Sequence, residues 1–278
     1  MEDAITLYRG MSRAALDAAY NNGAAVSDSP RLLADFQARS DQLRAARPQY
    51  LDLRYGAAER NRIDYFAARA GGPVLVFIHG GYWQMRQKET FSFLAEGPLA
   101  HGINVALVGY TLAPEKQLTG IVAEVRAAVD WLARRVADYG GNPSRLYVSG
   151  WSAGGHLAAI CIGEAAVQGG LAVSGIFDLE PIRLCYLNEK LGLDEEEASR
   201  LSPLLHLPLR SGPFVVAYGG AELPELQRQS GAFAAACARA GLPVRAVPLA
   251  GHNHFTVLEE LAHPDGALTT LVRELVGS

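Results

Sequence analysis

Six short apolar segments, mostly bounded by Gly or Pro, constrain the fold more than any other feature of this 278-residue chain. Runs of this length without polar alternation are typical of strands buried on both faces of a sheet. Helical stretches lie between them, so strand and helix alternate. We therefore predict an α/β fold with a mostly parallel central sheet and helices on both faces. The predicted strands are residues 74–78, 105–108, 146–149, 173–177, 214–218 and 244–249, and the predicted helices are 121–137, 153–166 and 225–240.

The chain before residue 74 follows a different pattern. Residues 12–20 and 30–46 read as helices, the second with Ser29 as its N-cap and Pro30 at its first position. Residues 50–54 and 62–66 alternate apolar with polar side chains, which predicts a leading pair of antiparallel strands.

Residues 179–209 also interrupt the alternation and are predicted to form a small inserted cap with two short helical pieces. Within it, Asp194 is expected to cap a helix, and the glutamates up to residue 197 are expected to complement the helix dipole on a solvated face. We predict a single domain over residues 1–278. Its N-terminal helices, within residues 1–48, are expected near the mouth of the active site.

The composition excludes several classes of protein. Hydrophobic residues make up 49% of the chain and charged residues 19%, which excludes a disordered polyelectrolyte. The net charge of −4 comes from 25 basic and 29 acidic residues without a basic stripe, so nucleic acid is not an expected partner. No apolar run approaches the roughly 20 residues that span a bilayer, and the acidic start at residues 1–4 does not resemble a basic signal peptide.

The number and spacing of the cysteines exclude further classes of site. The three cysteines are odd in number and widely spaced, which fits neither a disulfide framework nor a metal site. We therefore expect a cytoplasmic protein with no metal, no cofactor and no membrane partner. The sequence does not determine the oligomeric state, and a homodimer is compatible with it. The cysteines are Cys161, Cys185 and Cys237.

The strongest chemical signal is the sequence Gly150-Trp151-Ser152-Ala153-Gly154, a GxSxG motif between a predicted strand and a predicted helix. A sharp strand-to-helix turn strains the backbone at the serine and leaves no room for side chains two residues to either side. Ser152 is then a candidate nucleophile at a helix N-terminus. The Ala153 amide is aimed at negative charge on a substrate oxygen.

A second signal, His79-Gly80-Gly81-Tyr82-Trp83, follows the apolar strand at residues 74–78. Glycine at this place lets backbone amides approach a substrate carbonyl. We expect the amides of Gly81 and Tyr82 to form an oxyanion hole together with that of Ala153. The alternative is a tight turn with a buried aromatic pair.

A nucleophilic serine needs a base and an acid, which in this fold follow it in the order acid, histidine. The segment 251–255 supplies two candidate bases, His252 and His254. Glu222, in the loop after the strand at 214–218, is the first candidate acid. Glu225, in a first helical turn, and Asp178, after the preceding strand, are rivals with ordinary structural explanations. Structural roles are expected for the other histidines, His79, His101, His156, His206 and His263.

Taken together, these residues resemble a known family. The strand-to-helix turn at Ser152, called the serine elbow below, resembles the corresponding turn of α/β-hydrolases. The turn at His79-Gly80-Gly81 is similar to that of hormone-sensitive-lipase-like esterases. Those esterases have a third glycine where this chain has Tyr82. With this tyrosine, the turn resembles that of the kynurenine formamidase (arylformamidase) family. The resemblance spans nearly the whole chain. Its segments are residues 79–84 (HGGYWQ), 17–22 (DAAYNN), 175–182 (GIFDLEPI), 200–203 (RLSP) and 224–230 (PELQRQS).

The resemblance implies a catalytic triad of Ser152, Glu222 and His254. It prefers His254 because the family has its histidine in an HF pair, which here is His254-Phe255. Many relatives have aspartate where this chain has Glu222, so the glutamate departs from the pattern while retaining a carboxylate. His252 is then expected to line the pocket or to cap the loop.

The resemblance further implies hydrolysis of N-formyl-L-kynurenine to formate and kynurenine, a step of tryptophan degradation. The residues themselves predict a serine hydrolase that removes a small acyl group from an aryl amide or ester. Tyr82 and Trp83 are expected to narrow the acyl side or to stack on an aromatic leaving group. Tyr20, Asn21 and Arg86 are candidates for binding the amino-acid end. The alternatives are a carboxylesterase or aryl acylamidase and, more remotely, a non-catalytic ligand-binding homologue.

Overall fold

The computed structural model describes residues 6–277, so the acidic residues 1–5 and Ser278 lie outside the described part. Its centre is one eight-stranded sheet with the order β1-β2-β4-β3-β5-β6-β7-β8. The pairings from β4 through β3 to β8 are parallel, whereas β1 with β2 and β2 with β4 are antiparallel. The strands are β1 (Leu53–Arg54), β2 (Arg62–Phe66), β3 (Gly72–Ile78), β4 (Asn104–Val108), β5 (Gly141–Trp151), β6 (Val167–Val173), β7 (Phe214–Gly219) and β8 (Val244–Leu249). The mostly parallel α/β sheet is therefore confirmed.

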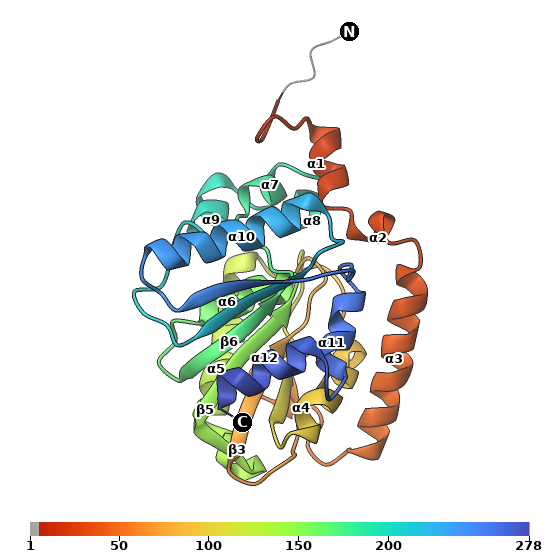
Figure 1. Ribbon diagram of the computed structural model, residues 1–278, viewed down its shortest axis with the longest axis vertical. Helices are drawn as coiled ribbons and strands as arrows, with labels where there is room; N and C mark the ends of the chain where they lie inside the picture. Colours follow the sequence, from red (N-terminus) through yellow and green to blue (C-terminus); the bar gives the residue numbers. More distant parts are fainter. Residues whose placement is uncertain (1–5, 278) are drawn as a thin grey trace.

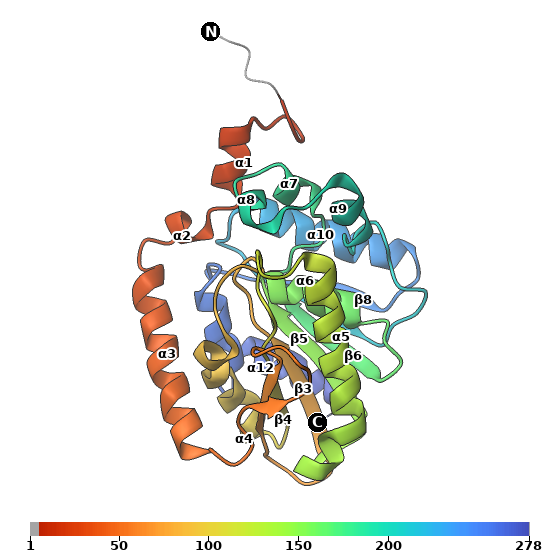
Figure 2. The same cartoon turned by 180° about the vertical axis from the view of Figure 1, so that it is seen from behind.

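Helices cover both faces of this sheet (Figures 1 and 2). The helices are α1 (Arg13–Ala19), α2 (Asn22–Ala25), α3 (Ser29–Ala46), α4 (Glu96–Ala100), α5 (Leu118–Arg135), α6 (Ala153–Cys161), α7 (Glu180–Arg183), α8 (Asn188–Leu191), α9 (Glu195–Arg200), α10 (Pro224–Arg239), α11 (Glu259–Ala262) and α12 (Ala267–Val276). Three 3-10 segments join them: η1 (Lys88–Ala95), η2 (Val136–Tyr139) and η3 (Thr256–Leu258). One core packs α5, α6 and α10 on the sheet, and the other packs α3, α4, α11 and α12.

Strand β3 shows why the apolar runs carry no polar alternation. Its seven residues are all buried. Side chains alternate across a strand, so Val76 and Ile78 enter the core beneath α5 and α6, whereas Leu75 and Phe77 enter the core beneath α3 and α12. Both faces of a central strand are covered, and both therefore require apolar side chains.

The strand predicted at residues 173–177 was placed too late in the chain. The observed strand, β6, ends at Val173, because Ser174 adopts φ +53° and turns the chain out of the sheet. Gly170 lies inside β6, where a Cβ atom would collide with the carbonyl oxygen of Val148. Glycine is required at this position because the two strands pack closely there, so a glycine does not mark the end of this strand.

Smaller differences concern helix ends and the cap. The helix predicted at 153–166 ends at Cys161, and α3 has Asp28 rather than Ser29 as its N-cap. The segment 179–209 contains three short helices instead of two, α7, α8 and α9. Asp194 caps α9 as expected, but Glu197 is buried and accepts hydrogen bonds from the Thr119 amide and hydroxyl.

One end of the molecule carries α1, α2 and the three cap helices, at the top of Figures 1 and 2. The loops that follow parallel strands meet at one edge of the sheet, which is where α/β proteins bind ligands. Within residues 6–277, no helix combines the length and the apolar character that crossing a membrane requires.

Candidate active site

Ser152 lies on the sharp turn between β5 and α6 with φ +57° and ψ −120°, and it is 2% exposed. A residue with a side chain is strained at such angles. A Cβ atom at Gly150 would collide with the carbonyl oxygen of Gly154, and one at Gly154 would collide with that of Ile78. The two glycines are therefore required by the turn that presents the serine.

The loop after β3 lies directly against this elbow. A Cβ atom at Gly80 would be 3.0 Å from the Cβ atom of Ser152. Gly81, Tyr82 and Trp83 follow with φ of +115°, +49° and +58°, a run of left-handed backbone. Within residues 6–277, the amides of Gly81 and Tyr82 donate to no protein acceptor. They are free to bind a substrate oxygen, and the Ala153 amide lies at the first turn of α6.

His79 braces the base of this loop. Its Nδ1 atom is 2.8 Å from the Gly80 carbonyl oxygen, and its ring stacks on Tyr110 with centroids 4.4 Å apart. The Tyr110 hydroxyl donates to the His79 carbonyl at 2.9 Å. Burial lowers the pKa of His79 to about 4, and the ring contacts only the loop and its neighbours in these bonds, which is compatible with the predicted structural role.

Glu222 and His254 meet in the interior, with 3.1 Å between Glu222 Oε2 and His254 Nδ1. The other carboxylate oxygen, Oε1, accepts the Ser174 hydroxyl at 2.5 Å and the Gly219 amide at 2.7 Å. The carboxylate is thus held by three donors, from the loop after β6, from the end of β7 and from the loop after β8. Both side chains are almost fully buried, which strengthens the interaction of a carboxylate with a developing imidazolium.

His254 is also fixed through its backbone carbonyl group, which contacts Trp151. The Trp151 indole N–H donates to the His254 carbonyl at 2.8 Å, and the two rings have centroids 4.8 Å apart. His252 lies away from the cavity. Its Nδ1 is 3.2 Å from the Thr256 carbonyl, and its Nε2 is 3.4 Å from Glu260, so this histidine ties the loop to the following helices.

The two rival acids have other partners. Asp178 accepts the Tyr8 hydroxyl at 2.6 Å and caps the Glu180 amide at 3.1 Å. Glu225 pairs with Arg228 at 2.8 Å in the first turn of α10. Among residues 6–277, neither carboxylate forms a hydrogen bond or an ion pair with His254 or His252.

A cavity of about 180 Å³ joins these parts, with Ser152 and His254 both in its wall. Of the residues predicted to bind substrate, Tyr82, Asn21 and Arg86 line the cavity. Tyr20 and Trp83 do not, which corrects that expectation. The Trp83 ring is fully buried and packs edge-on against His156 with centroids 5.0 Å apart, and the Tyr20 side chain bonds to α10.

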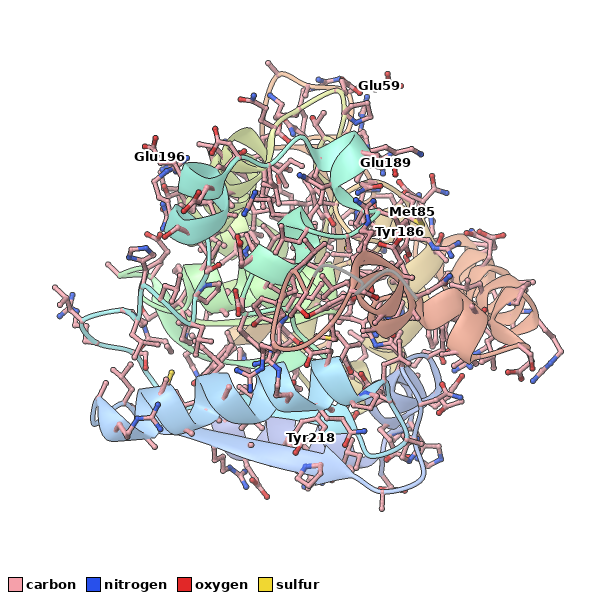
Figure 3. The ribbon with its side chains drawn as sticks, turned by 90° about the horizontal axis from the view of Figure 1, so that it is seen from above. Glu59, Met85, Tyr186, Glu189, Glu196 and Tyr218 are labelled. Carbon is pink, nitrogen blue, oxygen red and sulfur yellow. The ribbon has the colours of Figure 1, made fainter. Side chains whose placement is uncertain are left out.

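Six residues of the site were not predicted from the sequence: Asn22, Gly23, Ser29, Met85, Ser174 and Tyr186. Asn22 and Tyr186 line the cavity beside Met85, which is 41% exposed at its mouth. Figure 3, which looks onto the cap end, shows Met85 and Tyr186 next to each other. Ser174 donates a hydrogen bond to Glu222, the predicted acid. The DAAYNN segment was the available signal for Asn22, whereas nothing local distinguishes Ser174 from other serines.

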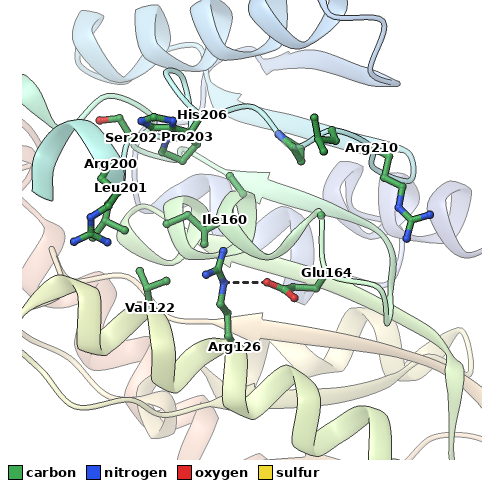
Figure 4. A pocket seen from close by; sticks show the side chains of 14 residues that line it. Val122, Arg126, Ile160, Glu164, Arg200, Leu201, Ser202, Pro203, His206 and Arg210 are labelled. Carbon is green, nitrogen blue, oxygen red and sulfur yellow. Dashed lines mark ion pairs between the residues drawn. The ribbon is translucent and has the colours of Figure 1, made fainter. Parts of the chain in front are cut away.

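A larger cavity, of about 610 Å³, opens between α5, α6 and residues 200–210 (Figure 4). Its wall includes His206 and an ion pair at 2.9 Å between Arg126 and Glu164. It contains no serine elbow and lies apart from the Glu222–His254 pair. Across residues 6–277, no group of three or more His, Cys, Asp or Glu side chains is arranged to hold a metal ion.

The elbow serine, the paired carboxylate and histidine, and the parallel sheet together define an enzyme of the serine hydrolase type with the α/β-hydrolase fold. Residues 75–207 match the α/β-hydrolase fold family. A kynurenine formamidase from Danio rerio is 31% identical over 274 residues, covering 90% of this chain and 92% of the relative. One from Salmo salar is 32% identical and covers 86% and 85%. The chain belongs to the kynurenine formamidase family of α/β-hydrolases.

Solved structures agree on the architecture. A crystal structure from Silicibacter sp., provisionally assigned as a thioesterase, superposes with a TM-score of 0.84 at 30% identity. The superposition covers 92% of this chain and 98% of that one.

Proposed function

We propose that the protein is an arylformamidase that hydrolyses N-formyl-L-kynurenine to formate and kynurenine. The observation that carries the proposal is the placement of Ser152 and His254 in the wall of one small cavity, with Glu222 bonded behind the histidine. Relatives matched over nearly their whole length are kynurenine formamidases, which adds the substrate class.

In the proposed mechanism, Ser152 Oγ attacks the formyl carbon while His254 Nε2 takes its proton. The amides of Gly81, Tyr82 and Ala153 bind the resulting oxyanion. Collapse breaks the C–N bond, and the aryl amine leaves with the proton from His254. Water then attacks the formyl ester, gives a proton to His254 and releases formate as Ser152 regains its hydrogen. Glu222 orients the imidazole and stabilises its charged form throughout.

The cavity supports a small acyl group and an acidic substrate. Its volume of about 180 Å³ lies below the range of roughly 300–1,000 Å³ that is usual for small-molecule sites. Of the described residues that line it, Arg86 alone carries a permanent charge. We propose that Arg86 binds the carboxylate of the amino-acid end and that Asn21 lies beside it.

The surrounding segments support the same arrangement. Asn21, Asn22, Gly23 and Ser29 from the N-terminal helices and Tyr186 from the cap line the cavity. We therefore propose that residues 1–278 work as one catalytic domain, with residues 179–209 as a cap over its mouth. The cysteines are free and buried, which supports a site of action in the reducing cytoplasm.

The test compares hydrolysis of N-formylkynurenine with that of its neutral analogue, 2-formamidoacetophenone, by the purified protein. Arg86→Gln should lower kcat/KM by about 10- to 100-fold for the acid and leave the neutral analogue within threefold. Arg134→Gln, a change at the far end of α5, is the matched control. Equal losses of kcat/KM on both substrates would show that Arg86 does not bind the carboxylate.

The second candidate function is a carboxylesterase or aryl acylamidase, which the esterase folds among the solved structures favour. An acyl-length series on a common aryl leaving group separates the two. We expect kcat/KM to fall steeply from formyl or acetyl towards hexanoyl, because each poorly fitting methylene costs about 1–3 kcal/mol. An optimum at long acyl chains, with no turnover of N-formylkynurenine, would favour the esterase. Loss of all turnover in Ser152→Ala is the control for contaminating enzymes.

A further inference from the structure

The segment Tyr20-Asn21-Asn22 supplies no group to the bond-breaking or proton-transfer steps. It is joined to residues 79–83, here called the oxyanion loop. We infer that this segment, together with α2, positions the oxyanion hole through the side chain of Tyr82. The inference rests on the proposed function in one respect: it takes the Tyr82 amide as an oxyanion donor. Tyr20 and Asn22 are then positioning residues that act through Tyr82.

The evidence is a pair of buried hydrogen bonds on one phenol. Asn22 Nδ2 donates to the Tyr82 hydroxyl oxygen at 2.8 Å, and that hydroxyl donates to the Tyr20 carbonyl oxygen at 2.5 Å. Tyr20, Asn22 and Tyr82 are 0%, 4% and 9% exposed. Burial raises the pKa of Tyr82 well above its usual value, so the phenol remains a hydrogen-bond donor. The phenol can donate once, and that donation goes to the backbone of the N-terminal segment.

The oxyanion loop needs such an anchor because its backbone is strained. Tyr82 and Trp83 are two successive residues with side chains in the left-handed region, at φ +49° and +58°. Strained conformations persist only where the surroundings hold them in place. The buried indole of Trp83 holds one of the two residues, and the phenol bonds hold the other. The direction of the Tyr82 amide depends on this backbone.

The same segment is tied to the helix that follows the acid. The Tyr20 hydroxyl donates to Glu225 at 3.2 Å and accepts from Gln229 Nε2 at 2.8 Å, and both partners lie on α10. Glu222 lies two residues before this helix, which begins at Pro224. Tyr20 thus joins the loop of the oxyanion hole to the loop of the acid, two parts of the site that no strand pairing connects directly.

Tyr82→Phe keeps the ring and removes both bonds, and Asn22→Ala removes one of them. We expect each change to lower kcat by about 10- to 100-fold with KM within threefold, since a misplaced oxyanion donor affects the transition state more than the bound substrate. The double variant should be no more than about threefold worse than Tyr82→Phe, because the two residues act through one contact. Tyr65→Phe, which removes another buried phenol hydroxyl on β2, is the control.

The readout that separates positioning from folding is inhibition by an aryl trifluoromethyl ketone, which forms an oxyanion on the elbow serine. The inhibition constant of this ketone should rise in parallel with the loss in kcat/KM. The midpoint temperature of thermal unfolding should be no lower for Tyr82→Phe than for Tyr65→Phe. Asn22→Asp, which removes the amide donor at constant size, serves if Asn22→Ala fails to fold. Unchanged kcat, or a loss confined to KM, would overturn the inference.

The assays use both N-formylkynurenine and phenyl acetate. Failure of the unmodified protein on the formamide with retained ester hydrolysis would overturn the proposed substrate and still leave the positioning test readable on the ester. Normal formamide hydrolysis by Tyr82→Phe would overturn the inference and leave the proposed function standing.

Discussion

At the scale of single residues, the two histidines after β8 differ in what they contact. Only His254 bonds to Glu222 and lines the cavity, whereas His252 bonds to Thr256 and Glu260. We expect His254→Ala to lower kcat by about four to six orders of magnitude, as removal of a member of a cooperating triad does. His252→Ala should retain most of the turnover. Steady-state kinetics on both variants decide this, and the reverse ranking would make His252 the base.

The carboxylates can be separated in the same way. Glu222→Gln should cost about three to four orders of magnitude in kcat, because an amide does not stabilise the imidazolium and can favour the wrong tautomer. Asp178→Asn should be milder, since its partners are Tyr8 and the Glu180 amide. Circular dichroism of each variant controls for folding. A near-normal Glu222→Gln enzyme beside an inactive Asp178→Asn enzyme would move the acid to the end of β6.

At the scale of elements, α10 holds the segment after β6 through one buried side chain. Gln229 Oε1 accepts the amides of Phe177 and Asp178 at 2.6 and 2.8 Å. Gln229→Leu would leave both amides without an acceptor. At about 1–3 kcal/mol for each unpaired buried group, we expect the two amides to lower the free energy of unfolding by roughly 2–6 kcal/mol.

Urea unfolding measures that loss, with Gln168→Leu, at an exposed position near the start of β6, as the matched control. The control should change the free energy of unfolding by less than about 0.5 kcal/mol. A Gln229→Leu protein as stable as the control would mean that the segment after β6 is held by its other contacts.

At the scale of the whole molecule, stability should depend on pH through two buried histidines. Burial lowers the pKa of His79 and of His156 to about 4, against roughly 6.5 in an unfolded chain. Between these values the unfolded state binds protons that the native state does not, so the free energy of unfolding falls as the pH falls. The slope approaches about 1.4 kcal/mol per pH unit for each histidine.

Urea unfolding between pH 7.5 and 4.5 checks this dependence. His156→Gln retains a donor for the Leu201 carbonyl, which His156 contacts at 2.8 Å, and should reduce the slope by about half. Stability that is flat or rises between pH 6.5 and 5 would show that these rings are protonated in the native state.

The sequence by itself predicted the α/β sheet, the strand-to-helix turn at Ser152 and the glycine-rich turn after β3. These features depend on neighbours along the chain: a buried strand needs a continuous apolar run, and a sharp turn needs glycine where a Cβ atom would collide. Such requirements are recorded in short stretches of sequence. The order of serine, acid and histidine is likewise a property of the chain and could be anticipated.

Only the tertiary structure decided which distant residues support those motifs. Ser174 reaches Glu222 across 48 positions, and Asn22 reaches Tyr82 across 60. It also decided that Trp83 points into the core while Arg86 faces the cavity. A hydrogen bond between buried side chains leaves no periodicity or spacing in either segment, because its geometry depends on how separate loops pack at one edge of the sheet.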